Sequence, residues 1–358
     1  MTTSNSTLES ALDQAGNIRD GEELDTAIIE KFVKQHVDNL EGDLRITQFP
    51  GGASNLTYAL SFDNQELILR RPPFGTIAKS AHDMGREYRV MDKLKPTYPY
   101  VPKMIAFCDD PSIIGCDFYL MERLVGIIPR SELPKDLTLT KQETNTLCTN
   151  VVDKLIELHQ VDIEASGLAE LGKGDGYIER QIEGWSKRYR NAKTDNVPDF
   201  EKVMAWLHDN MPKQVKTCII HNDFRFDNVV LNPENPTEVI GVLDWEMATL
   251  GDPLMDLGNS LAYWIEATDD PMMQMTRRQP THLEGMMTRQ QVVDYYCDKM
   301  GIECDDFTFY RVYGLFRLAG IIQQIYYRFH HGQTKDKRFA NFFMMSTHLE
   351  TICLGLIS

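Results

Sequence analysis

The sequence predicts an α+β protein of two lobes, in which a lobe built on an antiparallel β-sheet precedes a mainly helical lobe. Three short extended runs follow one another between residues 43 and 72, separated by the segments GGASN and DNQE. Beyond Arg123 the apolar residues recur mostly at helical spacing. A length of 358 residues is sufficient for two such lobes around a cleft.

The N-terminal lobe is expected to span residues 23–122, after a flexible arm at residues 1–22 that lacks apolar periodicity. Its first element is an amphipathic helix, because apolar residues recur at helical spacing from Leu24 to Leu40. The next elements in order are three strands, a helix and two further strands, at residues 43–50, 56–63, 66–72, 80–95, 104–108 and 117–124.

The helical lobe is expected to span residues 123–358. Its clearest helix carries an apolar stripe from Leu147 to Leu158. Short apolar runs bounded by Asn, Pro and Asp interrupt the helices and predict strands at 218–221, 228–232 and 238–245. The last third of the chain is helical and rich in aromatic residues.

The composition, with 42% hydrophobic and 25% charged residues, is typical of a soluble globular protein. The formal net charge of −16 repels polyanions, so nucleic acid is not expected as a partner. Seven scattered cysteines, none spaced C-x-x-C, fit reduced thiols better than a zinc site or a disulfide framework. The polar N-terminus and the lack of an apolar run near ~18 residues predict neither signal peptide nor membrane span, so a cytoplasmic location is expected.

The strongest chemical signal is the segment HNDFRFDN, which begins at His221 between two predicted strands. Phosphoryl transfer needs a carboxylate that orients a hydroxyl and accepts its proton, and it needs oxygen ligands for magnesium. Asp223, followed five residues later by Asn228, supplies both. The following strand ends in Asp244, sixteen residues after Asn228, and adds a carboxylate of the kind that binds magnesium. The alternative interpretation, a polar turn between two strands, does not explain why the second strand ends in Asp244.

A second signal is the small-residue segment between the first two predicted strands. Small residues at such a place let backbone N–H groups approach phosphate oxygens, although an ordinary hairpin loop has a similar composition. The candidate phosphate-binding residues in this segment are Gly51, Gly52, Ser54 and Asn55.

Together these motifs resemble the aminoglycoside phosphotransferase (APH) family, whose members have a two-lobed protein-kinase-like fold. The resemblance rests on H-x-D-x-x-x-x-N, on a strand that ends in D-W-E and on the segment GDPLMDL at residues 251–257. It covers roughly residues 24–330. It implies a phosphotransferase that uses ATP and Mg²⁺ and has an alcohol group as its acceptor.

The resemblance also implies a role for each matching residue. Asp223 would be the catalytic base, and Asn228 and Asp244 would be the magnesium ligands. Asp256 would brace the catalytic loop through hydrogen bonds, and His221 would be a structural member of that loop.

In kinases the strand after the glycine-rich loop carries a Lys that binds phosphate and pairs with a helix Glu. We assign these roles to Arg70 and Glu87; a guanidinium, although less common there than Lys, binds phosphate in a two-pronged way. Arg71 should point away, because side chains alternate along a strand. The backbone from Glu122 to Leu124 matches the interlobe hinge and would meet the adenine edge.

The chain most resembles the branch found alone in bacteria or fused to acyl-CoA dehydrogenases. Three segments carry this likeness: Leu69–Pro73, Trp245–Pro253 and Phe316–Ala319. The branch favours a hydroxyacyl-CoA or hydroxy acid as acceptor. Basic runs such as Arg277 and Arg278, or Lys187 to Arg190, could then bind the nucleotide end of CoA.

Two alternatives remain open. An aminoglycoside acceptor would use acidic residues of the helical lobe, namely Glu266, Asp269, Asp270, Asp305 and Asp306. A catalytically silent, pseudokinase-like protein that binds ligands would have lost part of the carboxylate set, which is intact here. A protein kinase is disfavoured, because only six residues separate Asp244 from Gly251 and leave no room for an activation segment. The oligomeric state and the choice between ATP and GTP are left open.

Overall fold

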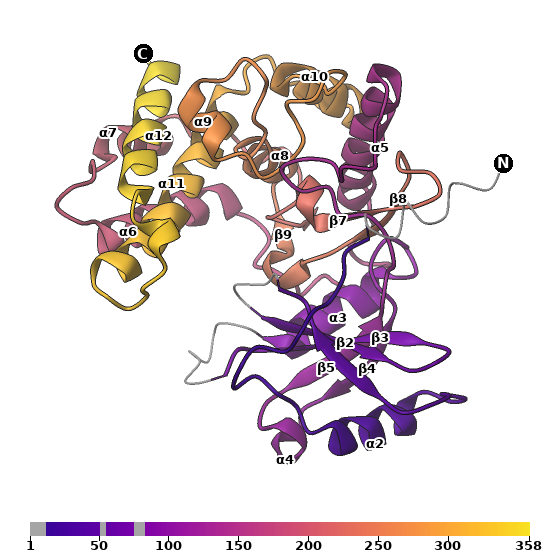
Figure 1. Cartoon of the computed structure of the whole chain (residues 1–358). Coiled ribbons are helices and arrows are strands. Elements are labelled where there is room, and N and C mark those ends of the chain that lie inside the picture. The colour runs from indigo at the N-terminus through magenta and orange to yellow at the C-terminus, as the bar shows by residue number, and fades with distance from the viewer. Residues whose placement is uncertain (1–11, 51–54, 75–82) are drawn as a thin grey trace.

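The computed structural model describes residues 12–50, 55–74 and 83–358. A sheet lobe, drawn mainly in indigo and purple in Figure 1, lies below a larger lobe of helices. The sheet has five strands in the order β1-β2-β3-β5-β4, and all neighbouring strands are antiparallel. This arrangement confirms the predicted α+β fold with an antiparallel N-terminal lobe and a helical C-terminal lobe.

The strands and helices of the first lobe agree closely with the sequence pattern. One short helix, α4, had not been predicted. The bounds of the described elements are β1 Arg45–Gln48, β2 Leu56–Ser61, β3 Glu66–Arg71, β4 Met104–Cys108, β5 Phe118–Glu122, α2 Thr26–His36, α3 Met84–Leu94 and α4 Pro111–Ile114.

The two faces of the sheet bury different cores because side chains alternate along each strand. Leu67 and Leu69 of β3 pack with Ile29 and Val33 of α2 on one face. Ile68 lies on the other face, within the core that the sheet shares with α3 and the helical lobe. Alternation therefore turns the next residue on that side, Arg70, toward the second lobe.

Residues 12–22, which belong to the predicted flexible arm, contact the sheet. Gly16 and Gln48 exchange two main-chain hydrogen bonds of 2.8 and 3.0 Å, which adds this segment to the edge of β1. The hydroxyl of Tyr58 donates to the main-chain oxygen of Glu22 at 2.7 Å. The side chain of Arg123 donates to the main-chain oxygen of Asp13 at 2.9 Å. The segment has little apolar periodicity because it is fixed mainly by polar contacts with the sheet.

We expect Gly16→Pro to release this segment while Gly16→Ala leaves it in place. Proline removes the N–H that bonds to Gln48, whereas a Cβ at Gly16 would meet no heavy atom within 4 Å. Loss of one hydrogen bond of about 1 kcal/mol should speed hydrogen exchange across residues 12–22 by about fivefold. Equal exchange in the two variants would show that this pairing does not hold the segment.

The helical lobe contains two small two-stranded sheets. One of their strands, β9, had not been predicted. None of the helices within the described residues is both long and apolar enough to cross a membrane. The bounds are α5 Lys141–His159, α6 Tyr177–Ala192, α7 Glu201–Asp209, β6 Cys218–Ile220, η2 Phe226–Asn228, β7 Val229–Leu231, β8 Val239–Val242, η3 Trp245–Met247, β9 Thr249–Gly251, α8 Pro253–Leu261, α9 Pro271–Met275, α10 Arg289–Met300, α11 Thr308–His330, η4 Lys337–Phe339 and α12 Phe342–Leu356.

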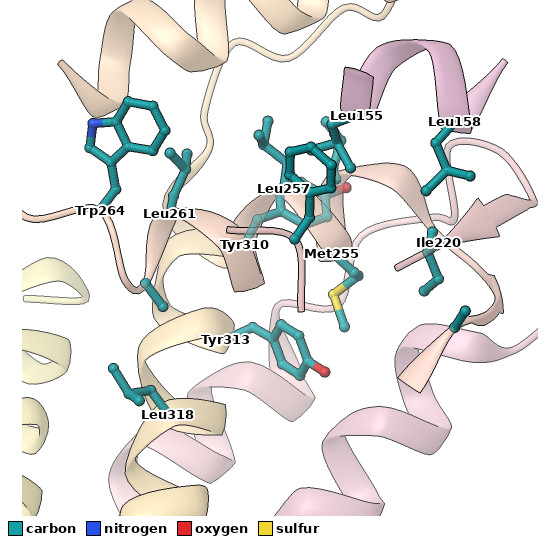
Figure 2. Packing of buried hydrophobic residues seen from close by; sticks show 14 of the residues in the cluster. Leu155, Leu158, Ile220, Met255, Leu257, Leu261, Trp264, Tyr310, Tyr313 and Leu318 are labelled. Atoms are coloured by element: carbon teal, nitrogen blue, oxygen red, sulfur yellow. The ribbon is translucent and has the colours of Figure 1, made fainter. Parts of the chain in front are cut away.

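Helix α8 forms the centre of this lobe, and all nine of its residues are buried. Figure 2 shows Met255 and Leu257 of α8 among side chains from α5 and α11, with Tyr313 of α11 close by. Glycines allow α8 and α11 to approach closely: a Cβ at Gly258 would lie 2.4 Å from the main-chain oxygen of Tyr310. The core therefore holds α8, which carries Asp256, in a fixed position.

Candidate active site

The candidate site is a cleft of about 1010 Å³ between the sheet and the helical lobe. It gathers side chains from β3, α3, the segment after β5, the loop at residues 221–228 and the chain after β8. Gly51, Gly52 and Ser54 lie outside the described residues. The predicted site residues that line the cleft are Asn55, Arg70, Glu87, Glu122, Leu124, Asp223, Asn228 and Asp244.

Asp223 lies in the loop at residues 221–228, which follows β6. Its carboxylate oxygen Oδ2 accepts hydrogen bonds from Arg225 Nη2 and Asn228 Nδ2, both at 3.1 Å. Asn228 Nδ2 also donates to the main-chain oxygen of Asp223 at 2.8 Å. Two residues of the same loop therefore fix the carboxylate where it faces the cleft.

His221, the first residue of this loop, is completely buried. Its Nδ1 accepts from the main-chain N–H of Asp223 at 3.2 Å, and its Nε2 faces the main-chain oxygen of Leu243 at 3.0 Å. Burial lowers the pKa of His221, although Asp256 and Asp223 oppose this effect. A neutral ring with its proton on Nε2 satisfies both contacts. These are the contacts of a structural residue that joins the loop to the end of β8.

Asp256 lies behind the loop and is fully buried. Its two oxygens accept the main-chain N–H groups of His221 and Asn222 at 2.8 and 2.7 Å. The ring of His159 on α5 contacts the same carboxylate at 3.1 Å. Burial would raise the pKa of Asp256, but the hydrogen bonds from His159 and His221 hold it below its usual value. The predicted brace lies where expected, whereas His159 had no sequence signal because it is 97 residues distant.

Asp244 follows β8 in a left-handed backbone conformation, with φ of 68°. Its Oδ1 accepts a hydrogen bond of 2.8 Å from Arg70 Nη2. Burial would raise the pKa of Asp244, but the charge and hydrogen bond of Arg70 hold it below its usual value. Asp244 is therefore an anionic oxygen donor in the same cleft as Asn228.

These donors fit magnesium. The amide nitrogen of Asn228 is occupied by Asp223, so the amide oxygen is the atom available to a cation. Mg²⁺ typically binds one or two carboxylates and completes its shell with water and substrate phosphates. Within the described ranges, no group of three or more His, Cys, Asp or Glu side chains could hold a metal ion by itself.

Arg70 links Asp244 to helix α3. Its Nη1 lies 3.4 Å from Glu87 Oε1, and only 13% of the Arg70 side chain is exposed. Burial raises the pKa of Glu87, although the charge of Arg70 opposes this effect. Arg71 lies on the opposite face, with its guanidinium 3.7 Å from the ring centre of Phe74. The structure thus brings Arg70 and not Arg71 into the cleft, as strand alternation predicts.

The segment after β5 forms the edge of the cleft where the lobes meet. The main-chain N–H of Glu122 donates to Lys103, and its carboxylate accepts from Lys95 Nζ at 3.1 Å. Leu124 also lines the cleft. Glu122 is the last residue of β5, an inner strand of the sheet, and the chain leaves the sheet after it.

The helical lobe contributes several guanidinium groups to its side of the cleft, which sequence reasoning had only partly identified. Arg225 lies 4.6 Å from the ring centre of Tyr263, and its Nε lies 3.2 Å from Asp227 Oδ1. Arg317, buried on α11, donates to the main-chain oxygen of Asn222 at 2.9 Å. Arg278, Arg338, Trp185 and Ile321 complete this part of the lining. Arg317 belongs to Phe316–Ala319, which the sequence marked only as part of the family likeness, and Trp185 had no individual signal, because helical spacing alone does not distinguish a cleft from a core.

The acidic residues considered for an aminoglycoside are engaged elsewhere. Glu266 and Asp269 contact Arg289 at 3.4 and 2.6 Å. Asp270 caps α9 and pairs with His348. These acids do not gather at the cleft.

The chain has sequence relatives among acyl-CoA dehydrogenase family members. It is 38% identical to acyl-CoA dehydrogenase family member 10 of Mus musculus, over 86% of this chain and 29% of that protein. It is 32% identical to family member 11 of Rattus norvegicus, over 87% of this chain and 41% of that protein. The chain thus spans less than half the length of these relatives, whose names agree with the branch that the sequence resembles.

Among solved structures, a putative aminoglycoside phosphotransferase from Ralstonia eutropha JMP134 is 30% identical with a TM-score of 0.79, over 93% of this chain and 98% of that one. A thermostable mutant of aminoglycoside phosphotransferase APH(4)-Ia, solved with AMP-PNP and hygromycin B, has the same fold at 14% identity and a TM-score of 0.58, over 92% of this chain and 98% of that one. The model of the phosphotransferase enzyme family (APH) matches residues 45–287. The chain therefore belongs to the APH phosphotransferase family.

Proposed function

We propose that this protein transfers the γ-phosphoryl group of ATP, with Mg²⁺, to the hydroxyl of a small anionic molecule. The observation that carries this proposal is the grouping of Asp223, Asn228, Asp244 and Arg70 in one cleft. A carboxylate oriented by an amide, beside an anionic oxygen donor and a guanidinium, is the set that phosphoryl transfer requires.

In this reaction Asp223 orients the acceptor hydroxyl and takes its proton as the oxygen attacks the γ-phosphorus. The bond between the γ-phosphorus and the β,γ-bridging oxygen breaks, and ADP leaves with that oxygen. Arg225 and Asn228 hold Asp223 in position for this step. Asn228 and Asp244 would hold Mg²⁺, which neutralises charge on the phosphates.

The nucleotide is assigned to the sheet side of the cleft. Arg70 would bind phosphate oxygens while Glu87 holds its guanidinium in place, and the main chain near Leu124 would meet the adenine. The solved complex of APH(4)-Ia with AMP-PNP supports a nucleotide site in this fold. The segment that holds Gly51, Gly52 and Ser54 remains our candidate for further phosphate contacts.

The acceptor is assigned to the end of the cleft that Arg225, Arg278, Arg317 and Arg338 line. Guanidinium groups favour carboxylates and phosphates, and they disfavour polycations such as aminoglycosides. Asp223 and Asp227, the carboxylates at this end, are both in contact with Arg225. We therefore favour a hydroxy acid or a hydroxyacyl-CoA, and the names of the relatives support an acyl-CoA ligand.

A catalytically silent ligand-binding protein is the second candidate. Asp223, Asn228 and Asp244 all remain in place, whereas a silent relative would be expected to have lost one of them. This favours an active enzyme.

A screen of acceptors with Mg²⁺ and ATP tests the proposal. We expect kcat/KM for a hydroxyacyl-CoA or a hydroxy acid to exceed that for kanamycin-type aminoglycosides, because the acceptor end of the cleft is cationic. Higher values for the aminoglycosides would reverse the assignment of the acceptor but leave the phosphotransferase assignment intact. No transfer to any acceptor, together with ligand binding, would favour the silent protein.

We also expect Arg278→Ala to raise KM for the anionic acceptor by about tenfold, which corresponds to one charge-assisted hydrogen bond. KM for ATP should not change, because the two ligands occupy different ends of the cleft. Arg277→Ala is the matched control, since Arg277 contacts Glu132 and does not belong to the cleft lining. Equal effects of the two variants would contradict the role of Arg278.

A further inference from the structure

The chain directly after Asp244 is held from both sides by side chains. Arg86 Nη1 donates to the main-chain oxygen of Glu246 at 3.2 Å, and Arg86 Nη2 donates to that of Ala248. Between them, the main-chain oxygen of Met247 accepts from Asn222 Nδ2 at 3.1 Å. Arg86 belongs to α3 of the sheet lobe, whereas Asn222 belongs to the catalytic loop.

This segment needs such support. Asp244 has φ of 68°, and a residue with a Cβ in this conformation costs about 1 kcal/mol or more unless its surroundings fix it. The following 3-10 helix, η3, has only three residues, so it leaves carbonyl groups that other donors must satisfy. The guanidinium of Arg86 satisfies two of these carbonyls with one rigid group.

The first turn of α3 is itself fixed in place. Asp83 caps the helix by accepting from the main-chain N–H of Arg86 at 2.8 Å. The next residue, Glu87, contacts Arg70, which in turn bonds to Asp244. Two neighbouring residues of α3 therefore reach the Asp244 segment by separate routes, Arg86 through the main chain and Glu87 through Arg70.

We propose that Arg86 is a positioning residue that locks α3 onto the segment after Asp244 and so fixes the Asp244 carboxylate for the metal. The proposal rests on the proposed function, since it concerns the metal and phosphate side of the same site. Arg86 acts through Asp244 and does not itself touch the substrates.

The test compares Arg86→Ala with Arg89→Ala. Arg89 lies three residues later on the same helix and is exposed, so the two substitutions remove the same side chain from one element. We expect Arg86→Ala to raise the Mg²⁺ concentration for half-maximal activity by about tenfold and to lower kcat by about tenfold, as supporting residues of metal sites do. Arg89→Ala should change neither quantity.

Arg86→Lys distinguishes a positioning role of Arg86 from a loss of the folded structure in Arg86→Ala. Lysine keeps the positive charge but replaces the rigid planar fork of the guanidinium with a compact ammonium group, so this variant should fold normally and show an intermediate Mg²⁺ requirement. A wild-type Mg²⁺ requirement in both Arg86 variants would overturn the proposal.

A second measurement decides the inference if the wild-type chain transfers no phosphate. Hydrogen exchange across residues 244–251 should be faster in Arg86→Ala than in Arg89→Ala, whatever the reaction. If the wild-type chain transfers no phosphate but hydrogen exchange is faster in Arg86→Ala, the proposed function is rejected and the positioning role of Arg86 stands. Unchanged exchange in Arg86→Ala would reject the lock.

Discussion

Asp223→Asn is expected to lower kcat by about hundredfold or more while nucleotide binding stays within a few-fold of wild type. The amide keeps the shape of the side chain but cannot accept the acceptor's proton, and positioned bases contribute about 10²–10⁴-fold. Steady-state kinetics with the best acceptor and calorimetry with nucleotide would measure the two quantities. A variant that kept more than about a tenth of wild-type kcat would show that another group takes the proton.

Asp227→Asn is the matched control for this experiment. Asp223 and Asp227 both contact Arg225, at 3.1 and 3.2 Å, so either substitution removes one negative charge beside the same guanidinium. Only Asp223 is also fixed by Asn228. We expect Asp227→Asn to keep kcat within about tenfold of wild type. Equal losses would indicate a general electrostatic effect in place of a base.

Asp244→Asn is expected to abolish the tightening of ATP binding by Mg²⁺. The substitution removes the negative charge that would bind the bridging metal, and asparagine tolerates the φ of 68° better than alanine does. Calorimetric titrations of ATP with and without Mg²⁺ measure this effect directly. Glu246→Gln is the control, because Glu246 lines the same cleft two residues later. If Mg²⁺ tightened ATP binding in Asp244→Asn as in wild type, Asp244 would not be the ligand.

Local patterns in the sequence determined the fold class and most of its elements. The change from period 2 to helical spacing placed the sheet before the helices, and the observed strands β1, β2 and β3 lie within the predicted runs. Alternation along β3 was enough to bring Arg70 and not Arg71 into the cleft. These features follow from neighbours within a few residues, where periodicity and turn residues act directly.

The spacing of H-x-D-x-x-x-x-N likewise brought Asp223 and Asn228 into contact, since both belong to one short loop. Whether they act as base and metal ligand remains a prediction. The contacts of residues 12–22 with the sheet could not be predicted, because main-chain pairing with β1 produces no apolar periodicity in the sequence.

Only the tertiary structure decided which distant groups support and surround the site. His159 reaches Asp256 across 97 residues, Arg86 reaches Glu246 across 160, and Arg317 reaches Asn222 across 95. Each of these side chains lies on a helix. The apolar pattern of a helix indicates only which of its faces is buried and does not indicate which distant residue a side chain contacts. A contact between separate elements depends on how the elements pack, and packing is determined by the summed burial of many side chains and not by any local run of residues.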